Sequence, residues 1–255
     1  MDTSVYQTSF HIDLRDVDFN KELKLSTLFG YFQEAASQAV DELGIGFAAL
    51  EREHGVAWAL LRMRVDLLRC PLWMERVTVE TWPLPPQLLE FERDFLLRDG
   101  HGEVIARASS VWVIFDTASR RLRKSETIAI DYPPFRTERA LGEKLRKLPD
   151  LTAPETAYHK TIGYSDVDLN GHMNNTRYLD YCMDCFPLEG HRQYGVRSVE
   201  ISYLNEALPG ETLELLRDVS AAGEGIISIA GQKPDGKTAF QARVHIERRC
   251  EDTAH

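Results

Sequence analysis

The sequence predicts an α+β protein in which one unit of helix and strands occurs twice. The first sign is an apolar face at helical spacing over Leu25–Leu43, and the second is the series of strand-like stretches that follows it. The third is the return of the same order of elements in the second half of the chain. With 255 residues, 43% of them hydrophobic, the chain can fill the cores of two such units.

The first half is expected to contain one long helix and about five strands. Gly44 and Gly46 end the helix. The strand candidates are rich in β-branched and aromatic residues and are separated by turn residues. They are Tyr6–Asp13, Trp58–Leu67, Val77–Trp82, Leu88–Leu97 and Glu103–Phe115.

The second half repeats this order after an interruption. Pro133 and Pro134 break the strand pattern, and Arg136–Leu148 is expected to form a short basic helix in a linker. A helix is then predicted over Asn175–Phe186. The accompanying strands are Tyr158–Tyr164, Val196–Leu204, Glu211–Val219, Gly225–Gln232 and Thr238–Arg248.

The two halves also match residue against residue. Val17–Glu22 lies 150 positions before Val167–His172, and the helices that follow align Tyr31 with Tyr181. After the helices, residue types pair Val65 with Val199 and Thr78 with Thr212.

A long apolar helix followed by antiparallel strands predicts a sheet wrapped around a helix. This is the hotdog fold, expected here as a double hotdog of two tandem repeats. The predicted organisation is an N-terminal repeat over 1–132, a linker over 133–155 and a C-terminal repeat over 156–255.

Polar side chains gather in Ser165–Asn175, just before the second helix. Asp168, Asn170 and His172 are alternate residues, so an extended backbone would point all three to one side. A carboxylate, an amide and an imidazole in one space can orient a water and move a proton. The alternative interpretation is a polar turn with a helix cap.

The first repeat lacks part of this set. Glu22 stands where the second repeat has His172, and the match by residue type places Leu72 opposite Glu206. A turn or cap alone would be expected to keep the same chemistry in both copies, so the difference favours a functional site in the second.

Composition excludes several classes. A formal net charge of −10 argues against a general nucleic-acid binder. No apolar run approaches the ~18 residues that span a bilayer, and no export signal is visible, so we expect no membrane association. Four cysteines without a regular framework suit a reducing cytoplasm. Cys182 and Cys185 are interpreted as core residues rather than metal or redox groups.

Basic residues are concentrated in the acidic chain. Arg120–Lys147 holds nine Lys or Arg against four Asp or Glu. The segment is either a solvated surface or a docking surface for an acidic partner.

Three stretches carry a resemblance to a known family, and the match covers nearly the whole chain. They are Arg93–Asp99, Arg107–Val113 continuing to Leu122, and Asp168–Asn175 with Tyr178. With them the sequence resembles the acyl-ACP thioesterases, which release fatty acids from acyl carrier protein (ACP) in plastids and bacteria. The chain starts almost directly with the first strand and shows no plastid transit peptide. In this it resembles the bacterial members of the family.

The resemblance implies catalytic roles. Asp168, Asn170 and His172 map onto the family's catalytic positions, and Glu206 maps onto its catalytic glutamate. Ala207 stands where the plant members have cysteine, so a cysteine nucleophile is not expected. Either Glu206 or His172 could take the proton from water, and N–H groups of the helix starting near Asn174 and Asn175 could hold the oxyanion. No metal or other cofactor is expected.

The resemblance also implies a division of labour in which the first repeat holds the acyl chain. Its apolar candidates are Phe29, Phe32, Trp58, Leu60, Leu61, Met63 and Leu67. Acyl-ACP is the expected substrate, with Arg120, Arg121 and Lys124 as docking candidates. An acyl-CoA thioesterase and a non-catalytic acyl-binding protein are the alternatives. The preferred chain length, and the choice between monomer and homodimer, stay open.

Overall fold

The computed structural model describes residues 4–124, 126 and 132–249, and it divides the chain into two units. Unit 1 is Met1–Arg146 and unit 2 is Lys147–His255. This division falls inside the predicted linker. Asp131 and the outermost residues of both predicted repeats lie outside the described residues.

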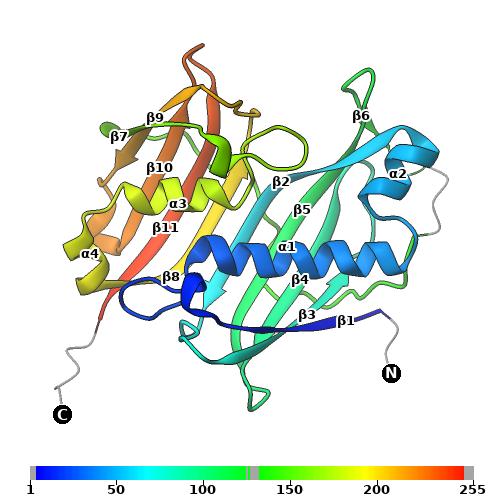
Figure 1. The fold of residues 1–255 in the computed structure, drawn as a ribbon, viewed down its shortest axis with the longest axis horizontal. Coiled ribbons are helices and arrows are strands. Elements are labelled where there is room, and N and C mark those ends of the chain that lie inside the picture. Colours follow the sequence, from blue (N-terminus) through cyan, green and yellow to red (C-terminus); the bar gives the residue numbers. More distant parts are fainter. Residues whose placement is uncertain (1–3, 125, 127–131, 250–255) are drawn as a thin grey trace. The chain divides into compact units, whose positions relative to one another are not determined.

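Unit 1 is an antiparallel sheet with one long helix on its face (Figure 1). Its strands are β1 (Tyr6–His11), β2 (Val56–Leu67), β3 (Arg76–Pro83), β4 (Phe91–Arg98), β5 (Val104–Asp116) and the short β6 (Leu122–Arg123). Its helices are α1 (Leu25–Glu42) and α2 (Phe47–His54), with a 3-10 turn at Leu14–Asp16. The strand order is β1-β3-β4-β5-β2, and β6 pairs with β5.

The apolar face of α1 forms the core of unit 1, as its spacing predicts. Phe29 and Phe32 are completely buried. The Phe32 ring lies 5.2 Å from that of Phe95 on β4, while Tyr31 stacks on Phe10 of β1 at 4.2 Å. Packing of this stripe, more than helix propensity, stabilises α1.

Unit 2 repeats the same topology. Its strands are β7 (Glu155–Thr161), β8 (Tyr194–Tyr203), β9 (Thr212–Asp218), β10 (Ile226–Gln232) and β11 (Thr238–Arg248). Its helices are α3 (Arg177–Asp184) and α4 (Leu188–Gln193), with 3-10 turns at Tyr164–Asp166 and Ala222–Glu224. The order β8-β11-β10-β9-β7 corresponds strand for strand to unit 1. The predicted hotdog fold is therefore confirmed for both halves.

The correspondence of the strands after the helices differs from the one predicted. In unit 1 the N–H groups of Leu68 and Arg69 both donate to one carbonyl, that of Ile105. In unit 2 the same bonds are made by Leu204 and Asn205 to Ala239. The pairings of Val65 with Val199 and of Thr78 with Thr212 are therefore wrong by two residues. A shift of two preserves strand alternation, so residue types alone could not exclude it.

The predicted basic helix over Arg136–Leu148 is also wrong, because this segment has no helical turns. Its polar groups bond to the sheet instead. The N–H of Ala140 donates to Asp94 Oδ2 at 2.6 Å, and the carbonyl of Glu138 accepts from the Trp82 indole at 3.0 Å. The apolar side that looked helical is buried at Leu141 and Leu145. The segment therefore crosses unit 1 as an irregular strap.

Two short helices were not predicted. α2 begins just after Gly46, which the sequence suggested only as a helix end, and it finishes at Gly55 in the left-handed region (φ 61°). α4 follows Pro187, which separates it from α3. No helix in the described residues is long and apolar enough to cross a membrane.

Candidate active site

The polar loop of unit 2 is a tight turn and not an extended strand. The N–H of Asp168 donates to the carbonyl of His172 at 2.8 Å, and the N–H of Gly171 donates to the carbonyl of Asp168 at 3.1 Å. Gly171 takes the left-handed conformation that closes the turn (φ 79°). The expectation that alternation aligns the three side chains is therefore wrong.

Asp168 holds this turn through its carboxylate. Its Oδ1 accepts the backbone N–H of Asn170 at 2.8 Å and that of His172 at 3.2 Å. The side-chain amide of Asn170 lies 3.5 Å from Asp168 Oδ2. Asp168 thus fixes the backbone from which the imidazole of His172 projects.

Unit 1 contains the same turn. Asp18 Oδ1 accepts the N–H groups of Asn20 at 2.8 Å and Glu22 at 3.1 Å. The Asp168 and Asn170 pattern is therefore an architectural feature of both repeats. The chemical difference between the repeats lies at His172 and at the residue facing it.

A backbone hydrogen bond brings His172 to Glu206. The N–H of Met173 donates to the carbonyl of Ala207 at 2.9 Å, which holds the two segments side by side within reach of their side chains. His172 Nε2 lies 3.6 Å from Glu206 Oε2, and the two side chains are 30% and 47% exposed. The separation slightly exceeds a direct hydrogen bond, and both groups remain accessible to water.

The counterpart of Glu206 in unit 1 is Cys70, not Leu72. The N–H of Leu23 donates to the carbonyl of Pro71 at 2.9 Å, which repeats the bond between Met173 and Ala207. Unit 1 therefore carries Glu22 and Cys70 where unit 2 carries an imidazole and a carboxylate. The conclusion that only the second repeat holds the full polar set is retained with this correction.

Basic and phenolic groups surround the loop of Glu206. Lys233 Nζ donates to the Glu206 carbonyl at 2.6 Å and lies 3.3 Å from Glu211 Oε2. Tyr178 is buried on α3 with its ring 5.1 Å from that of Phe240. Burial, with Glu206 nearby, raises the pKa of the Tyr178 hydroxyl, so this group stays protonated at neutral pH.

The N-terminal end of α3 was expected to offer N–H groups to an oxyanion, but its position and hydrogen bonds differ from that expectation. The helix begins at Arg177, two residues beyond the predicted Asn175. Asn174 already accepts the N–H of Thr176 through its side chain and that of Arg177 through its carbonyl, both at 2.9 Å. Neither of these N–H groups is therefore open to a substrate.

Among the described residues, the cysteines of α3 and its C-terminal end do not lie beside the pair as reactive thiols. Ala207 is completely buried, while Cys182 lies inside α3 and Cys185 caps the C-terminal end of that helix, both of them buried. Burial raises the pKa of the Cys185 thiol to about 12 and that of Cys182 well above its ordinary value. Among the described residues no group of three or more His, Cys, Asp or Glu is arranged to hold a metal ion.

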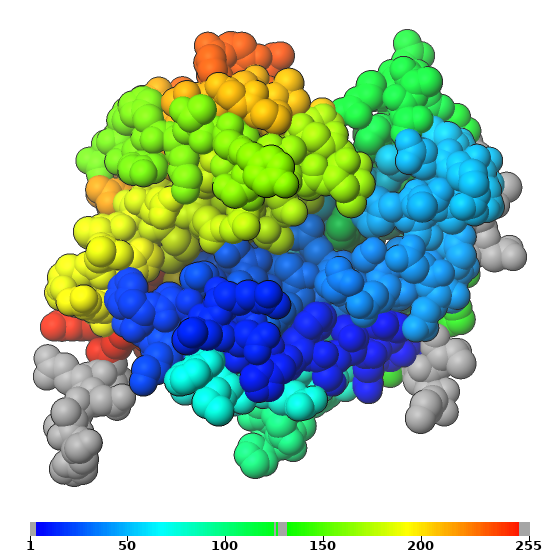
Figure 2. All heavy atoms as spheres, in the orientation of Figure 1, coloured from blue at the N-terminus to red at the C-terminus, as the bar shows by residue number. Residues whose placement is uncertain are grey.

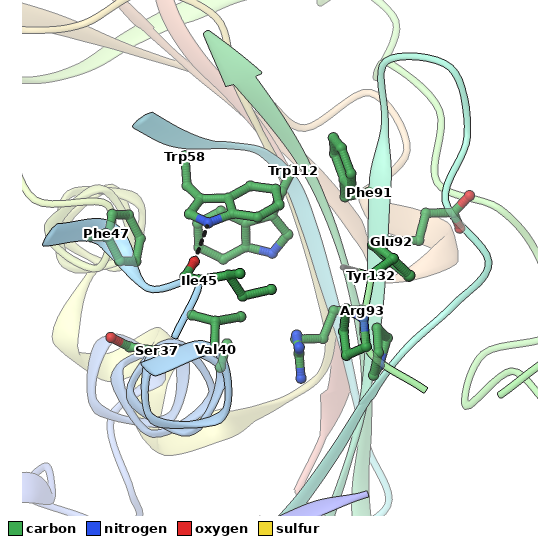
Figure 3. Close-up of a pocket in the computed structure, with 13 residues that line it drawn as sticks. Ser37, Val40, Ile45, Phe47, Trp58, Phe91, Glu92, Arg93, Trp112 and Tyr132 are labelled. Atoms are coloured by element: carbon green, nitrogen blue, oxygen red, sulfur yellow. Dashed lines mark hydrogen bonds between the residues drawn. The ribbon is translucent and has the colours of Figure 1, made fainter. Parts of the chain in front are cut away.

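A cavity of about 500 Å³, counting space open to solvent, lies in unit 1 (Figure 3). Its mostly apolar wall includes Val40 from α1, Trp58 from β2, Phe91 from β4 and Trp112 from β5. Of the seven residues proposed to hold an acyl chain, only Trp58 lines this cavity. The other six, Phe29, Phe32, Leu60, Leu61, Met63 and Leu67, do not.

Sequence reasoning missed most of the cavity wall. Arg93 lines it from β4, between the inward-facing Phe91 and Phe95 on the same strand. An arginine alternating with two buried aromatic residues was the available signal. The position of the cavity itself depends on where helix and sheet fail to meet, which alternation does not encode.

Models of the acyl-ACP thioesterase N-terminal domain and C-terminal domain match residues 3–130 and 152–247. The chain is 28% identical over 242 residues to the chloroplastic palmitoyl-acyl carrier protein thioesterase of Arabidopsis thaliana. That match covers 90% of this chain and 59% of the relative, so the chain spans little more than half the relative's length.

Solved structures give the same picture. An acyl-ACP thioesterase from Bacteroides thetaiotaomicron superposes with a TM-score of 0.84 at 25% identity, covering 96% of this chain and 98% of that one. The 12:0-ACP thioesterase from Umbellularia californica gives 0.81 at 23% identity, covering 98% and 99%, and supports the fold. Because the two family models together match both units, the chain belongs to the acyl-ACP thioesterase family.

Proposed function

We propose that this protein hydrolyses the thioester of fatty acyl-ACP, releasing free fatty acid and so ending chain elongation. One observation carries the proposal beyond family membership. The His172 and Glu206 side chains meet in unit 2, while the equivalent turn of unit 1 has Glu22 and Cys70. The turn occurs in both repeats, but only the copy in unit 2 carries an imidazole beside a carboxylate. This pair can accept a proton, so it is suited to catalysis.

In the proposed mechanism the pair activates a water. The water oxygen bonds to the thioester carbon as its proton passes to the pair, and the carbon–sulfur bond then breaks. The carrier leaves as a thiolate and recovers the proton. Residues of the pair, 3.6 Å apart, can share a water that neither could orient alone. With Ala207 in the loop, no acyl-enzyme on a neighbouring thiol is needed.

Asp168 and Asn170 act in this proposal as positioning residues. Asp168 holds the backbone N–H of His172, and the turn keeps the imidazole on the side of Glu206. The exposed side chain of Asn170 offers an amide donor to the developing oxyanion.

We assign the acyl chain to the cavity of unit 1. Each buried methylene contributes ~0.8 kcal/mol, so a fatty acyl substrate needs an apolar site of this kind. Trp58 and Trp112 supply wide apolar surfaces there.

Docking of ACP is assigned to the β5–β6 hairpin, which carries Arg120, Arg121 and Lys124 in exposed positions. In Figure 2 this hairpin projects from its unit (green). Other basic residues of the segment are engaged within unit 1. Arg139 lies 2.6 Å from Glu92, and Lys144 lies 2.9 Å from Glu90. The exposure of its basic side chains supports the hairpin as the docking site for an acidic carrier.

A panel of acyl-ACP and acyl-CoA substrates of several chain lengths, assayed for free thiol, tests the proposal. We expect release from acyl-ACP with a higher kcat/KM than from acyl-CoA. The reverse preference would favour an acyl-CoA thioesterase, and binding without any release would favour an acyl-binding protein. Four cysteines without a regular framework suit the cytoplasm, the compartment we propose.

A further inference from the structure

The cavity of unit 1 contains a buried guanidinium in a mostly apolar wall. Arg93 is 7% exposed. It projects from β4 into the space between sheet and helix, toward the side that Val40 lines (Figure 3).

This guanidinium has few partners. Its Nη1 donates to Thr81 Oγ1 at 3.2 Å, and the Thr81 hydroxyl gives its own proton to the carbonyl of Asp94 at 3.0 Å. No carboxylate among the described residues forms an ion pair with Arg93. An arginine has five N–H donors, and among the described residues only one donor of Arg93 has an acceptor.

Arg93 remains a cation despite its burial. Burial lowers its pKa to about 10, which is still well above neutral pH. Among the described residues the charge is therefore held in the wall without the paired anion that buried charges usually have.

Three other polar side chains around the cavity are already bonded within the protein. The Tyr132 hydroxyl donates to the carbonyl of Leu84 at 2.9 Å. The indole of Trp112 donates to Ser110 Oγ at 2.8 Å, and that of Trp58 to the carbonyl of Ile45 at 3.4 Å. Arg93 is distinguished from these three by its spare donors.

A plain hydrocarbon chain cannot satisfy these donors. When it fills the cavity it displaces water from the guanidinium and offers no acceptor, which opposes binding. A chain with an oxygen at the right depth replaces that water with a charge-assisted hydrogen bond.

We propose that the unit 1 cavity recognises acyl chains that carry an oxygen substituent, such as a hydroxyl group, and that Arg93 is the residue that selects them. This inference rests on the assignment of the acyl chain to unit 1. It adds a specificity for oxygenated chains to the proposed hydrolase.

Equilibrium binding tests the inference without hydrolysis. Methyl esters of one saturated fatty acid, and of isomers with a hydroxyl at successive carbons, are titrated into the full chain while tryptophan fluorescence is followed. Trp58 and Trp112 line the cavity and report its occupation. We expect one hydroxy isomer to bind at least ~10-fold more tightly than the saturated ester.

Arg93→Met supplies the matched comparison, because it keeps a long apolar side chain and removes every donor. The ratio of hydroxy to saturated affinity should fall at least ~10-fold, whereas a purely structural role would weaken both ligands alike. Arg93→Lys should restore part of the ratio.

Two outcomes overturn the inference. One is a wild-type protein that binds every hydroxy isomer more weakly than the saturated ester, a result that needs no variant to fold. The other is an unchanged ratio in folded Arg93→Met. Thiol release from saturated acyl-ACP is measured in parallel. If no thiol is released, the proposed hydrolase activity is refuted and the binding result still decides the specificity. If thiol is released but the binding test fails, only the proposed specificity for oxygenated chains is refuted.

Discussion

His172 Nε2 lies 3.6 Å from Glu206 Oε2 because the residues that follow them, Met173 and Ala207, are joined by a backbone hydrogen bond of 2.9 Å. The same bond joins Leu23 to Pro71 in unit 1. The protein thus presents two copies of one backbone arrangement, only one of which carries an imidazole and a carboxylate. Unit 1 therefore supplies internal controls for unit 2.

The two aspartates that hold the turns form the first matched pair. Asp168→Ala and Asp18→Ala each remove an acceptor of two backbone N–H groups, so each should lower the free energy of unfolding by about 1–2 kcal/mol in denaturant titrations. Only Asp168→Ala should also slow thiol release, because it loosens the backbone of His172. Equal catalytic losses in both variants would show that Asp168 acts through stability alone.

The cavity wall permits a second comparison, between neighbouring residues of α1. Ala36 lines the cavity, whereas Ala35 is completely buried and does not. Ala36→Phe should fill the cavity and shift the released fatty acids toward shorter chains, as measured by chromatography. Ala35→Phe should overpack the core and destabilise the protein by about 1–3 kcal/mol. If folded Ala36→Phe released fatty acids of unchanged chain length, the acyl chain would have to bind outside this cavity.

Most of the architecture was predictable because it depends on periodicity. The apolar stripe of α1 and the alternation of the strands are local patterns, and the structure follows them closely. The strap over Arg136–Leu148 was misjudged because its hydrogen-bond partners, Asp94 and Trp82, are distant in sequence. The Cys70 counterpart of Glu206 was missed because a shift of two residues keeps every side chain on its face.

The four candidate site residues were predictable as residue types, but their division of roles was not. Sequence alone grouped Asp168, Asn170 and His172 by alternation. The hydrogen bonds instead show Asp168 as the acceptor that holds the turn, with the same bonds made by Asp18 in unit 1. Arg93 was noticed only as part of a family motif, because its burial in a cavity is a tertiary property.

Thiol reagents should leave activity largely intact. Ala207 offers no nucleophile, and burial both shields Cys182 and Cys185 and raises their pKa values, so their thiols stay protonated at neutral pH. The measurement is kcat/KM before and after alkylation of the folded protein. Loss of activity that is reproduced in a folded cysteine-free variant would mean that a thiol takes part in the reaction.

Docking through the β5–β6 hairpin predicts a salt effect on one substrate only. KM for acyl-ACP should rise with ionic strength, while that for small thioesters should change little, because salt screens exposed charges. Charge reversal at Arg120, Arg121 and Lys124 should raise KM for acyl-ACP further, whereas reversal of Lys237, exposed on unit 2, serves as the control. If KM responded equally to salt for both substrates, the proposal that the hairpin binds ACP through its charges would be wrong.

The central claim is that the pair in unit 2 carries the chemistry, and thiol release by Glu206→Gln beside Glu22→Gln tests it most directly. Glu22 occupies in unit 1 the turn position that His172 occupies in unit 2, so its substitution controls for the loss of a carboxylate beside the repeated turn. We expect Glu206→Gln to lower kcat/KM for acyl-ACP at least ~100-fold, with Glu22→Gln close to wild type. Folded Glu206→Gln that retains near wild-type turnover would contradict the account.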